Sequence, residues 1–462
     1  MRDWLLKKFE DEDGNPTLGP NVADGNQAFQ PEKWQTFNQT DKFTMIQGFQ
    51  IDIMKGLFIK GTANWYYSEG LYESFTKDYM DNMLTEHYTK TRTSTAKFER
   101  NFAQTYNAVL NFTHTFAKDH NVNLMLGMEY YDNYKRGFEA KGSGAPTDDF
   151  SDLSLTDNGE GKRTINSWHE QYRILSYFGR LNYDYKSKYL LSAVFRQDGY
   201  SSLLGDNRWG FFPGVSVGWN IMEERFWKDS KISGVISNLK PRLSYGVNGN
   251  VNGIGNFDVY GAYSQVGAKT YGGSTAFYNS GLVNTGLRWE QSQSFEAGLD
   301  IGFLNNRLSF ILDYYNRTTK DLLTKQALPG YTGFTEIMTN MGTLRNYGFE
   351  MEVRANILNN PKGLTWDVTA NLSSVANKIV KLPYNGNPNN RVGGYEVATG
   401  RKKADGTDET KWIAGRQEGG KLGELVAYKQ NHIFKDWDDV KKYANNRIDE
   451  VANLYGPGLA AQ

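Results

Sequence analysis

The segment Phe349–Ile357 alternates strictly between apolar and polar side chains. The odd-numbered positions, which we call the apolar parity, are Phe349, Met351, Val353, Ala355 and Ile357. The even-numbered positions, the polar parity, are Glu350, Glu352, Arg354 and Asn356. Successive side chains of a β-strand point to opposite faces of a sheet. The segment therefore predicts a strand with one apolar face and one charged face.

The same alternation recurs along most of the chain. It is clear in 295–303 and again in 365–373, where Leu372 falls on the apolar parity and Asn371 on the polar one. We expect about thirteen strands, near 43–54, 56–68, 96–116, 121–141, 164–185, 188–199, 209–222, 240–249, 289–303, 307–318, 343–357, 364–378 and 421–433.

The connections between these strands differ systematically in length. Short turns alternate with long loops, the short ones near 54–56, 117–120, 186–188, 305–306 and 359–363, and the long ones at 69–95, 142–163, 250–288, 319–342 and 379–420. One end of the sheet therefore carries tight turns, and the other end carries large loops. Long up-and-down strands with this asymmetry are typical of a transmembrane β-barrel, whose large loops lie outside the cell.

Composition agrees with this interpretation. The 462 residues contain 52 basic and 52 acidic side chains, so no basic excess indicates nucleic-acid binding. The mean hydropathy is low although aromatic residues make up 14% of the chain, a combination that a barrel explains because alternate strand residues are polar. No apolar run approaches the ~18 residues of a membrane-spanning helix, and the absence of cysteine excludes disulfides and thiolate sites.

A soluble all-β protein with the apolar face inward is the alternative. About thirteen antiparallel strands exceed what an open twisted sheet usually carries without curling or splitting. Closure into a wide barrel with a polar lumen suits the charged faces better than two sandwiches do. The predicted fold class is therefore all-β, an antiparallel up-and-down transmembrane β-barrel.

Several stretches are distinctive as motifs. Arg196-Gln197-Asp198-Gly199 precedes Asn207-Arg208-Trp209-Gly210-Phe211-Phe212-Pro213, and three further stretches are Leu287–Glu290 with Leu299–Phe303, Asp313–Leu323, and Asn340–Glu350. Together they resemble the SusC/RagA-like family of TonB-dependent outer-membrane transporters from Bacteroidota. The segment Tyr200–Leu204 departs from the family pattern, because it lacks the usual Arg-Phe pair. The family-motif residues, for which we expect a structural role, are Asp198, Gly199, Asn207, Arg208, Trp209, Gly210 and Pro213.

The resemblance implies a domain organisation. Family members carry a plug domain and a barrel of about 22 strands, so we expect this chain to be a central part of the barrel without a plug. Residues 1–41 are expected to form an extended polar segment or extracellular loop, 42–433 the partial barrel, and 434–462 a periplasmic connection with a short helix.

The resemblance also implies a function and partners. It implies active import of oligosaccharides or peptides across the outer membrane of the cell, with a SusD-like surface lipoprotein as partner and TonB as the source of energy, acting through the plug. Outer-membrane lipid would surround the barrel, and nucleic acid is not an expected partner. A siderophore or cobalamin receptor is an alternative within this class, and a soluble or surface-attached glycan-binding β-protein is one from a different class.

The sequence contains no motif that predicts catalysis, a cofactor or a metal site. Glu296 with Asp300, Glu350 with Glu352, and Arg180 with Asp184 are better explained as polar lining of the lumen. Aromatic residues of the long loops could stack on sugar rings or peptide side chains, although packing within the loops explains them equally. They are Tyr260, Tyr263, Tyr271, Phe277, Tyr278, Tyr331, Phe334, Tyr384 and Tyr395. Tyr183, Tyr185 and Tyr189 flank a tight turn, where tyrosines suit a membrane–water interface.

Overall fold

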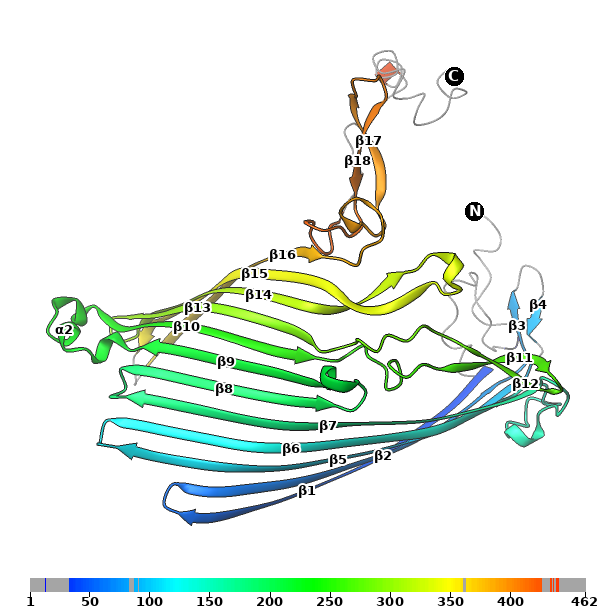
Figure 1. Ribbon diagram of the computed structural model, residues 1–462, viewed down its shortest axis with the longest axis horizontal. Coiled ribbons are helices and arrows are strands. Elements are labelled where there is room, and N and C mark those ends of the chain that lie inside the picture. Colours follow the sequence, from blue (N-terminus) through cyan, green and yellow to red (C-terminus); the bar gives the residue numbers. More distant parts are fainter. Residues whose placement is uncertain are drawn as a thin grey trace.

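The structure is a computed structural model that describes residues 13, 33–82, 87–89, 91–359, 363–425, 433, 435, 438 and 439. Its main feature is one antiparallel sheet of twelve strands, in which strands that follow one another along the chain are paired (Figure 1). The strands are β1 (Trp34–Met54), β2 (Leu57–Thr76), β5 (Thr93–Phe116), β6 (His120–Gly142), β7 (Arg163–Tyr185), β8 (Tyr189–Tyr200), β9 (Trp209–Trp219), β10 (Ile236–Asn250), β13 (Glu290–Phe303), β14 (Leu308–Ala327), β15 (Glu336–Asn359) and β16 (Thr365–Lys381).

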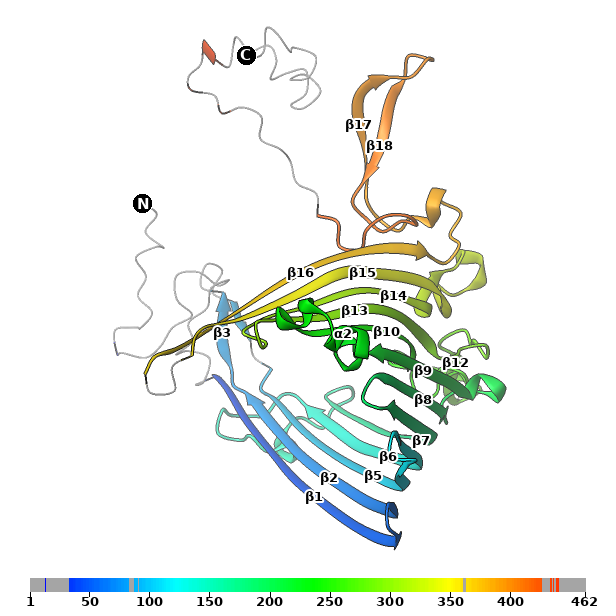
Figure 2. The same cartoon turned by 90° about the vertical axis from the view of Figure 1, so that its left-hand side faces the viewer.

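The sheet curves into an open arc, with β1 and β16 at its two edges (Figure 2). Tight turns lie at one end of the strands, except for the longer connection between β9 and β10, and the longest loops lie at the other end (Figure 1). The part of the chain that the structure describes holds no helix both long and apolar enough to cross a membrane.

Three short hairpins extend the loop end and were not anticipated. They are β3 (Tyr79–Asn82) with β4 (His87–Thr89), β11 (Tyr263–Tyr271) with β12 (Ser274–Asn279), and β17 (Tyr395–Lys402) with β18 (Asp408–Ile413). Each falls within a segment that the sequence predicts as loop. Their strands are short and pair with each other rather than with the main sheet, so they lack the long alternation that identifies the barrel strands.

Several boundaries differ from those expected. β2 ends at Thr76 rather than near 68, β14 ends at Ala327 rather than near 318, and β15 begins at Glu336 rather than near 343, so most of the loop expected at 319–342 is strand. β1 begins at Trp34, inside the segment expected to be irregular up to residue 41, because β2 continues far enough to pair with it: Trp34 lies opposite Thr76. The prediction of a strand at 421–433 is wrong for residues 421–425, which form turn and irregular structure. Residues 426–432 lie outside the described residues. The expected periplasmic connection at 434–462 also lies almost entirely outside them.

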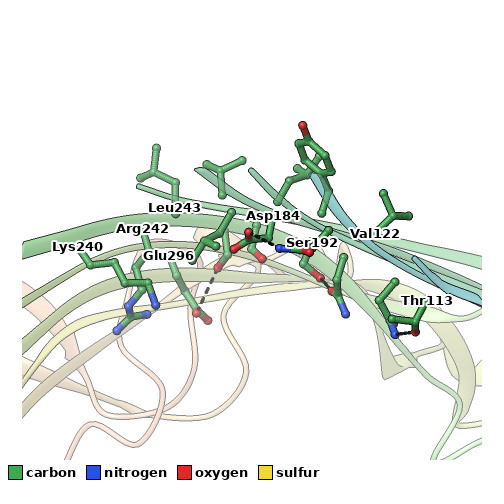
Figure 3. A pocket seen from close by; sticks show the side chains of 18 residues that line it. Thr113, Val122, Asp184, Ser192, Lys240, Arg242, Leu243 and Glu296 are labelled. Atoms are coloured by element: carbon green, nitrogen blue, oxygen red, sulfur yellow. Dashed lines mark hydrogen bonds between the residues drawn. The ribbon is translucent and has the colours of Figure 1, made fainter. Parts of the chain in front are cut away.

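The two faces of the sheet differ in chemistry. On the convex face apolar side chains are bare: Phe49 is 58% exposed and Leu372, opposite Met351 in the neighbouring strand, is 59% exposed. Polar side chains occupy the concave face, where Figure 3 shows Arg242 and Glu296 pointing away from the side that carries Leu243 and Val122. The parities are those that the sequence predicts.

The buried apolar core is not in the middle of the sheet but at its loop end. We call it the loop-end cluster, and it consists of Tyr200, Leu203, Phe212, Ile254, Val259, Leu287 and Trp289. The rings of Phe212 and Trp289 meet edge to face with centroids 5.3 Å apart. Leu203, from the segment that departs from the family pattern, is completely buried here.

The cluster forms where the ladder between β9 and β10 opens. These strands pair over Gly214–Gly218 and Arg242–Gly246, and pairing stops before Pro213, which has no amide hydrogen to continue it. The Phe212 ring occupies the opening, since a Cβ placed on Gly249 would lie 2.0 Å from its Cζ atom. A large aromatic ring thus replaces missing backbone pairing.

We expect Phe212→Ala to lower the free energy of unfolding by about 3–5 kcal/mol, because it leaves a cavity where no ladder can reform. A denaturant titration of the full-length protein in lipid vesicles measures this. Phe277→Ala is the control, because Phe277 lies exposed on the β11–β12 hairpin. An equal loss for the two variants would contradict a structural role for the cluster.

Candidate functional site

The concave face of the sheet is the candidate functional surface, because it gathers hydrogen-bonding side chains from many strands. A hollow on this face extends over strands β5 to β13 (Figure 3). Within it the Ser192 hydroxyl donates to Asn182 Oδ1 over 2.7 Å, and Asn123 Nδ2 donates to Thr113 Oγ1 over 2.8 Å. Such cross-strand pairs satisfy the polar groups that face away from lipid.

An ion-pair group spans three strands of this face. Arg242 of β10 contacts Asp300 of β13 (Nε to Oδ1, 3.3 Å) and Asp313 of β14 (NH2 to Oδ2, 2.6 Å). Gly298 lies between them, and a Cβ at this position would be 2.5 Å from both Arg242 Cζ and Asp313 Oδ1. A glycine is therefore required for the guanidinium to reach both carboxylates.

A second group lies nearer the loop end. Arg196 of β8 contacts Asp198 (Nε to Oδ1, 2.8 Å) and Glu129 of β6 (NH2 to Oε1, 3.1 Å), and it donates to the Ser176 hydroxyl over 2.8 Å. Its guanidinium also lies over the Phe178 ring, 5.4 Å from the centroid. The motif residue Asp198 is thus buried as part of the polar wall.

The other carboxylates predicted to line the lumen do so. Glu352 is ion-paired with Arg354, and Glu350 lies opposite Asp313 on the same face. Asp184 accepts hydrogen bonds from Asn121 Nδ2 (3.1 Å) and from the amide of Ser187 (2.9 Å).

The arrangement of these side chains is typical of the polar lining of a lumen rather than of an active site. In the part of the chain that the structure describes, no group of three or more His, Cys, Asp or Glu side chains could hold a metal ion. Arg242, one of the basic groups of the hollow, is paired with two carboxylates, so its charge is compensated within the surface. Such a surface suits a hydrated solute that passes through.

The motif residues lie at the loop end, between the polar wall and the loop-end cluster. Arg208 Nε donates to the Leu203 carbonyl over 3.1 Å, and Trp289 Nε1 donates to the Arg208 carbonyl over 2.9 Å. Gly199 lies under the Trp209 ring, since a Cβ there would be 2.7 Å from Trp209 Cζ3. Asn207 belongs to a 3-10 turn at Gly205–Arg208.

Sequence reasoning missed how the motif stretches are tied together. The side-chain amide of Asn340 donates to the carbonyls of Arg288 (2.8 Å) and Asp321 (2.7 Å), and its oxygen accepts from the Arg288 amide (3.0 Å). Glu290 accepts from the Leu323 amide over 2.6 Å and from Asn250 Nδ2 over 2.6 Å. All of these stretches lie at the loop ends of the strands. Their common position along the predicted strands is the signal from which their contact could have been predicted.

The aromatic residues of the long loops do not gather into one site. Tyr263, Tyr331 and Tyr384 are at least 73% exposed and stand on three different loops. Phe334 is half-buried and lines a smaller hollow with Phe257. The side chain of Tyr271 lies outside the described residues, and the remaining loop aromatics, Tyr260, Phe277, Tyr278 and Tyr395, are exposed. Apart from Tyr271, none of these side chains lines the polar hollow of the concave face.

We expect Gly298→Val to lower the free energy of unfolding by about 1–3 kcal/mol, because the side chain displaces Arg242 and leaves two carboxylates without their partner. Gly246→Val is the matched control: Gly246 lies in the neighbouring strand with no atom within 4 Å of its Cβ position. Denaturant titration of both full-length variants checks this, and an equal effect would contradict the proposed role of the glycine.

Comparison with known proteins gives concordant relatives. Residues 5–455 match the family model described as TonB dependent receptor-like, beta-barrel. The chain is 35% identical over 289 residues to the TonB-dependent receptor SusC of Bacteroides thetaiotaomicron, covering 60% of this chain and 27% of that protein. It is 33% identical over 268 residues to TonB-dependent receptor P3 of Formosa agariphila, covering 57% of this chain and 26% of that protein.

Solved structures agree at the level of the fold. The RagAB peptide transporter aligns with a TM-score of 0.72 at 22% identity, covering 84% of this chain and 45% of that one. The RagAB peptide importer in its closed-closed state gives 0.73 at 21% identity, covering 87% and 46%. The chain thus spans less than half the length of these four proteins. The resemblance to SusC/RagA-like transporters is confirmed, and the chain belongs to the TonB-dependent receptor-like β-barrel family.

Proposed function

We propose that the chain is the central barrel part of an outer-membrane active transporter of the SusC/RagA type, which imports oligosaccharides or peptides. The observation that carries the proposal is the division of the sheet into an exposed apolar convex face and a polar concave face with cross-strand ion pairs. Lipid accepts the first, and a water-filled lumen accepts the second. A TonB-dependent receptor of this family needs both.

The partners follow from the same proposal. A SusD-like lipoprotein would meet the loop end, where the hairpins extend beyond the sheet (Figure 1). TonB would act on a plug domain held within the completed barrel. Solutes of this size do not pass ordinary porins, so their import requires energy from the inner membrane. One structural relative is described as a peptide transporter, and the oligosaccharide class follows from the resemblance to the SusC/RagA-like family.

The motif residues take a structural role in this proposal. Arg208 and Trp209 border the opening of the β9–β10 ladder, and Asp198 fixes Arg196 in the polar wall. They would hold the loop end rigid while loops beyond it grip ligand and partner. None of them is proposed to contact the solute.

The soluble glycan-binding alternative is less favourable physically. It would leave a long band of large apolar side chains in water, whereas soluble monomers rarely expose such a contiguous patch. No catalytic activity and no cofactor form part of the proposal.

The proposed facing makes a paired prediction on β16. Leu372→Arg should cost ~2–4 kcal/mol in a refolding titration of the full-length protein into lipid, because the charge enters the bilayer near its midplane. Asn371→Arg, one residue away on the polar face, should cost much less. Equal costs would refute the assigned facing.

Transport itself is tested in the source bacterium. Deletion of the full-length gene should abolish growth on one class of oligosaccharide or peptide while growth on the corresponding monomer is kept. Complementation should require both TonB and an intact proton gradient. Unchanged growth on every oligosaccharide and peptide tested, or uptake that continues after the proton gradient is collapsed, would contradict the proposal.

A further inference from the structure

Four aromatic side chains form a row at the tight-turn end of the convex face. Tyr185 of β7 stacks on Tyr189 of β8 with centroids 6.3 Å apart, and Tyr189 stacks on Trp219 of β9 at 6.4 Å. The row does not end with the strands. Phe226, in the connection between β9 and β10, contacts Trp219 edge to face at 6.5 Å.

One carboxylate fixes this connection against the row. Glu224 accepts hydrogen bonds from Tyr189 Oη (2.7 Å), Lys188 Nζ (3.0 Å) and Trp219 Nε1 (3.3 Å). Because Tyr189 and Trp219 belong to the convex face, these bonds hold the start of the connection on that side of the sheet. The hydrogen bonds from Tyr189 and Lys188 lower the pKa of Glu224, because they stabilise its charged carboxylate.

The connection is ordered by its own hydrogen bonds. It comprises a 3-10 turn at Ile221–Glu223, the short helix α2 (Arg225–Lys228) and a second 3-10 turn at Lys231–Gly234 (Figure 1). The Lys228 amide donates to the Glu224 carbonyl over 3.0 Å, and Ser230 Oγ accepts from the Ile232 amide over 3.2 Å. An ordered segment of this length is unusual at the tight-turn end of this sheet, where the other connections are turns of a few residues.

The same connection presents large apolar side chains that the protein leaves uncovered. Phe226 is 60% exposed, and Ile232 and Val235 are each 54% exposed. Cations and carboxylates stand between them, with Lys228 ion-paired to Glu223 at 2.6 Å. Apolar anchors interspersed with charged groups are the composition of segments that lie in a membrane interface.

We propose that the connection 220–235 is a membrane-surface anchor that rests on the leaflet of the outer membrane at the tight-turn end, with Phe226 inserted among the lipids. Continuity identifies lipid as the occupant. Phe226 extends the row Tyr185–Tyr189–Trp219, and Trp219 shares its parity on β9 with the bare outer residues Val217 and Val215. Amphipathic rings at that height are typical of the boundary between hydrocarbon and water.

The anchor would have a mechanical consequence. It joins β9 to β10, the pair whose ladder is interrupted at Pro213. Attachment of this connection to the membrane would restrain the two strands at the end opposite the loop-end cluster. The weak ladder would then be held at both ends, by the cluster at one and by lipid at the other.

The test uses the full-length receptor, freed of any cysteine outside this cysteine-free chain, in phospholipid vesicles. Phe226→Cys carries an environment-sensitive fluorophore. Lipids with a nitroxide near the headgroup, and iodide in the buffer, serve as quenchers. Leu243→Cys on the convex face is the lipid reference, and Lys55→Cys in the β1–β2 turn is the aqueous reference.

We expect the nitroxide lipid to quench the probe at 226 several-fold more than the probe at 55, and iodide to show the reverse order. A probe at 226 as accessible to iodide as the one at 55, with the probe at 243 still quenched by lipid, would overturn the anchor. The inference rests on the proposed membrane placement of the sheet. Failure of lipid quenching at 243 would overturn that placement and the anchor with it, so the two failures are distinguishable.

A second measurement separates lipid contact from a structural role of the ring. Phe226→Leu keeps an apolar side chain, whereas Phe226→Asp places a charge at the interface. We expect the leucine variant to retain the wild-type unfolding midpoint in vesicles and the aspartate variant to lower it, with a smaller difference in detergent micelles than in vesicles. A difference of equal size in both media would contradict lipid attachment.

Discussion

The backbone hydrogen-bond ladder is the constraint on which the rest of this structure depends. A strand that crosses a bilayer must satisfy its amides and carbonyls by pairing with its neighbours, because hydrocarbon offers no other partner. Strands of up to 24 residues therefore pair in chain order across the whole sheet. The ladder of the main sheet is shortest between β9 and β10, and there side-chain packing replaces the missing backbone pairing. Phe212 and Trp289 fill the opening with a buried aromatic contact at the loop end.

The division of the two faces follows once the ladder is in place. When strands pair in register, their apolar side chains point to the same face of the sheet and their polar side chains to the other face. The alternation along each strand therefore gives one continuous apolar surface and one continuous polar surface. On the concave surface, Arg242 of β10 reaches Asp313 of β14 and Arg196 of β8 reaches Glu129 of β6, each across one intervening strand, and Gly298 leaves room for the first of these ion pairs. The result is a polar wall in which, among the described residues, no group of three or more His, Cys, Asp or Glu side chains could hold a metal ion.

Much of this arrangement could be predicted from the sequence, and the part that could depended on periodicity. The alternation in Phe349–Ile357 is enough to assign both faces of β15 and, through pairing, those of its neighbours. The hairpins β3–β4, β11–β12 and β17–β18 could not be predicted, because short strands that pair only with each other lack a buried face to impose a pattern. The role of Asn340 was also hidden, since its partners Arg288 and Asp321 are distant in sequence and offer backbone carbonyls. The motif stretches indicated the family, but the sequence did not show that these stretches contact one another in the fold.

The central claim is that the apolar parity faces lipid and the polar parity faces the lumen. Single cysteines placed at each position from Phe349 to Ile357 of the full-length receptor in membranes test this most directly, because this chain contains no cysteine of its own. A water-soluble maleimide should label Glu350, Glu352 and Arg354 positions rapidly, and the Phe349, Met351 and Val353 positions slowly. Labelling without a two-residue period, or with the opposite parity, would contradict the assignment of the two faces.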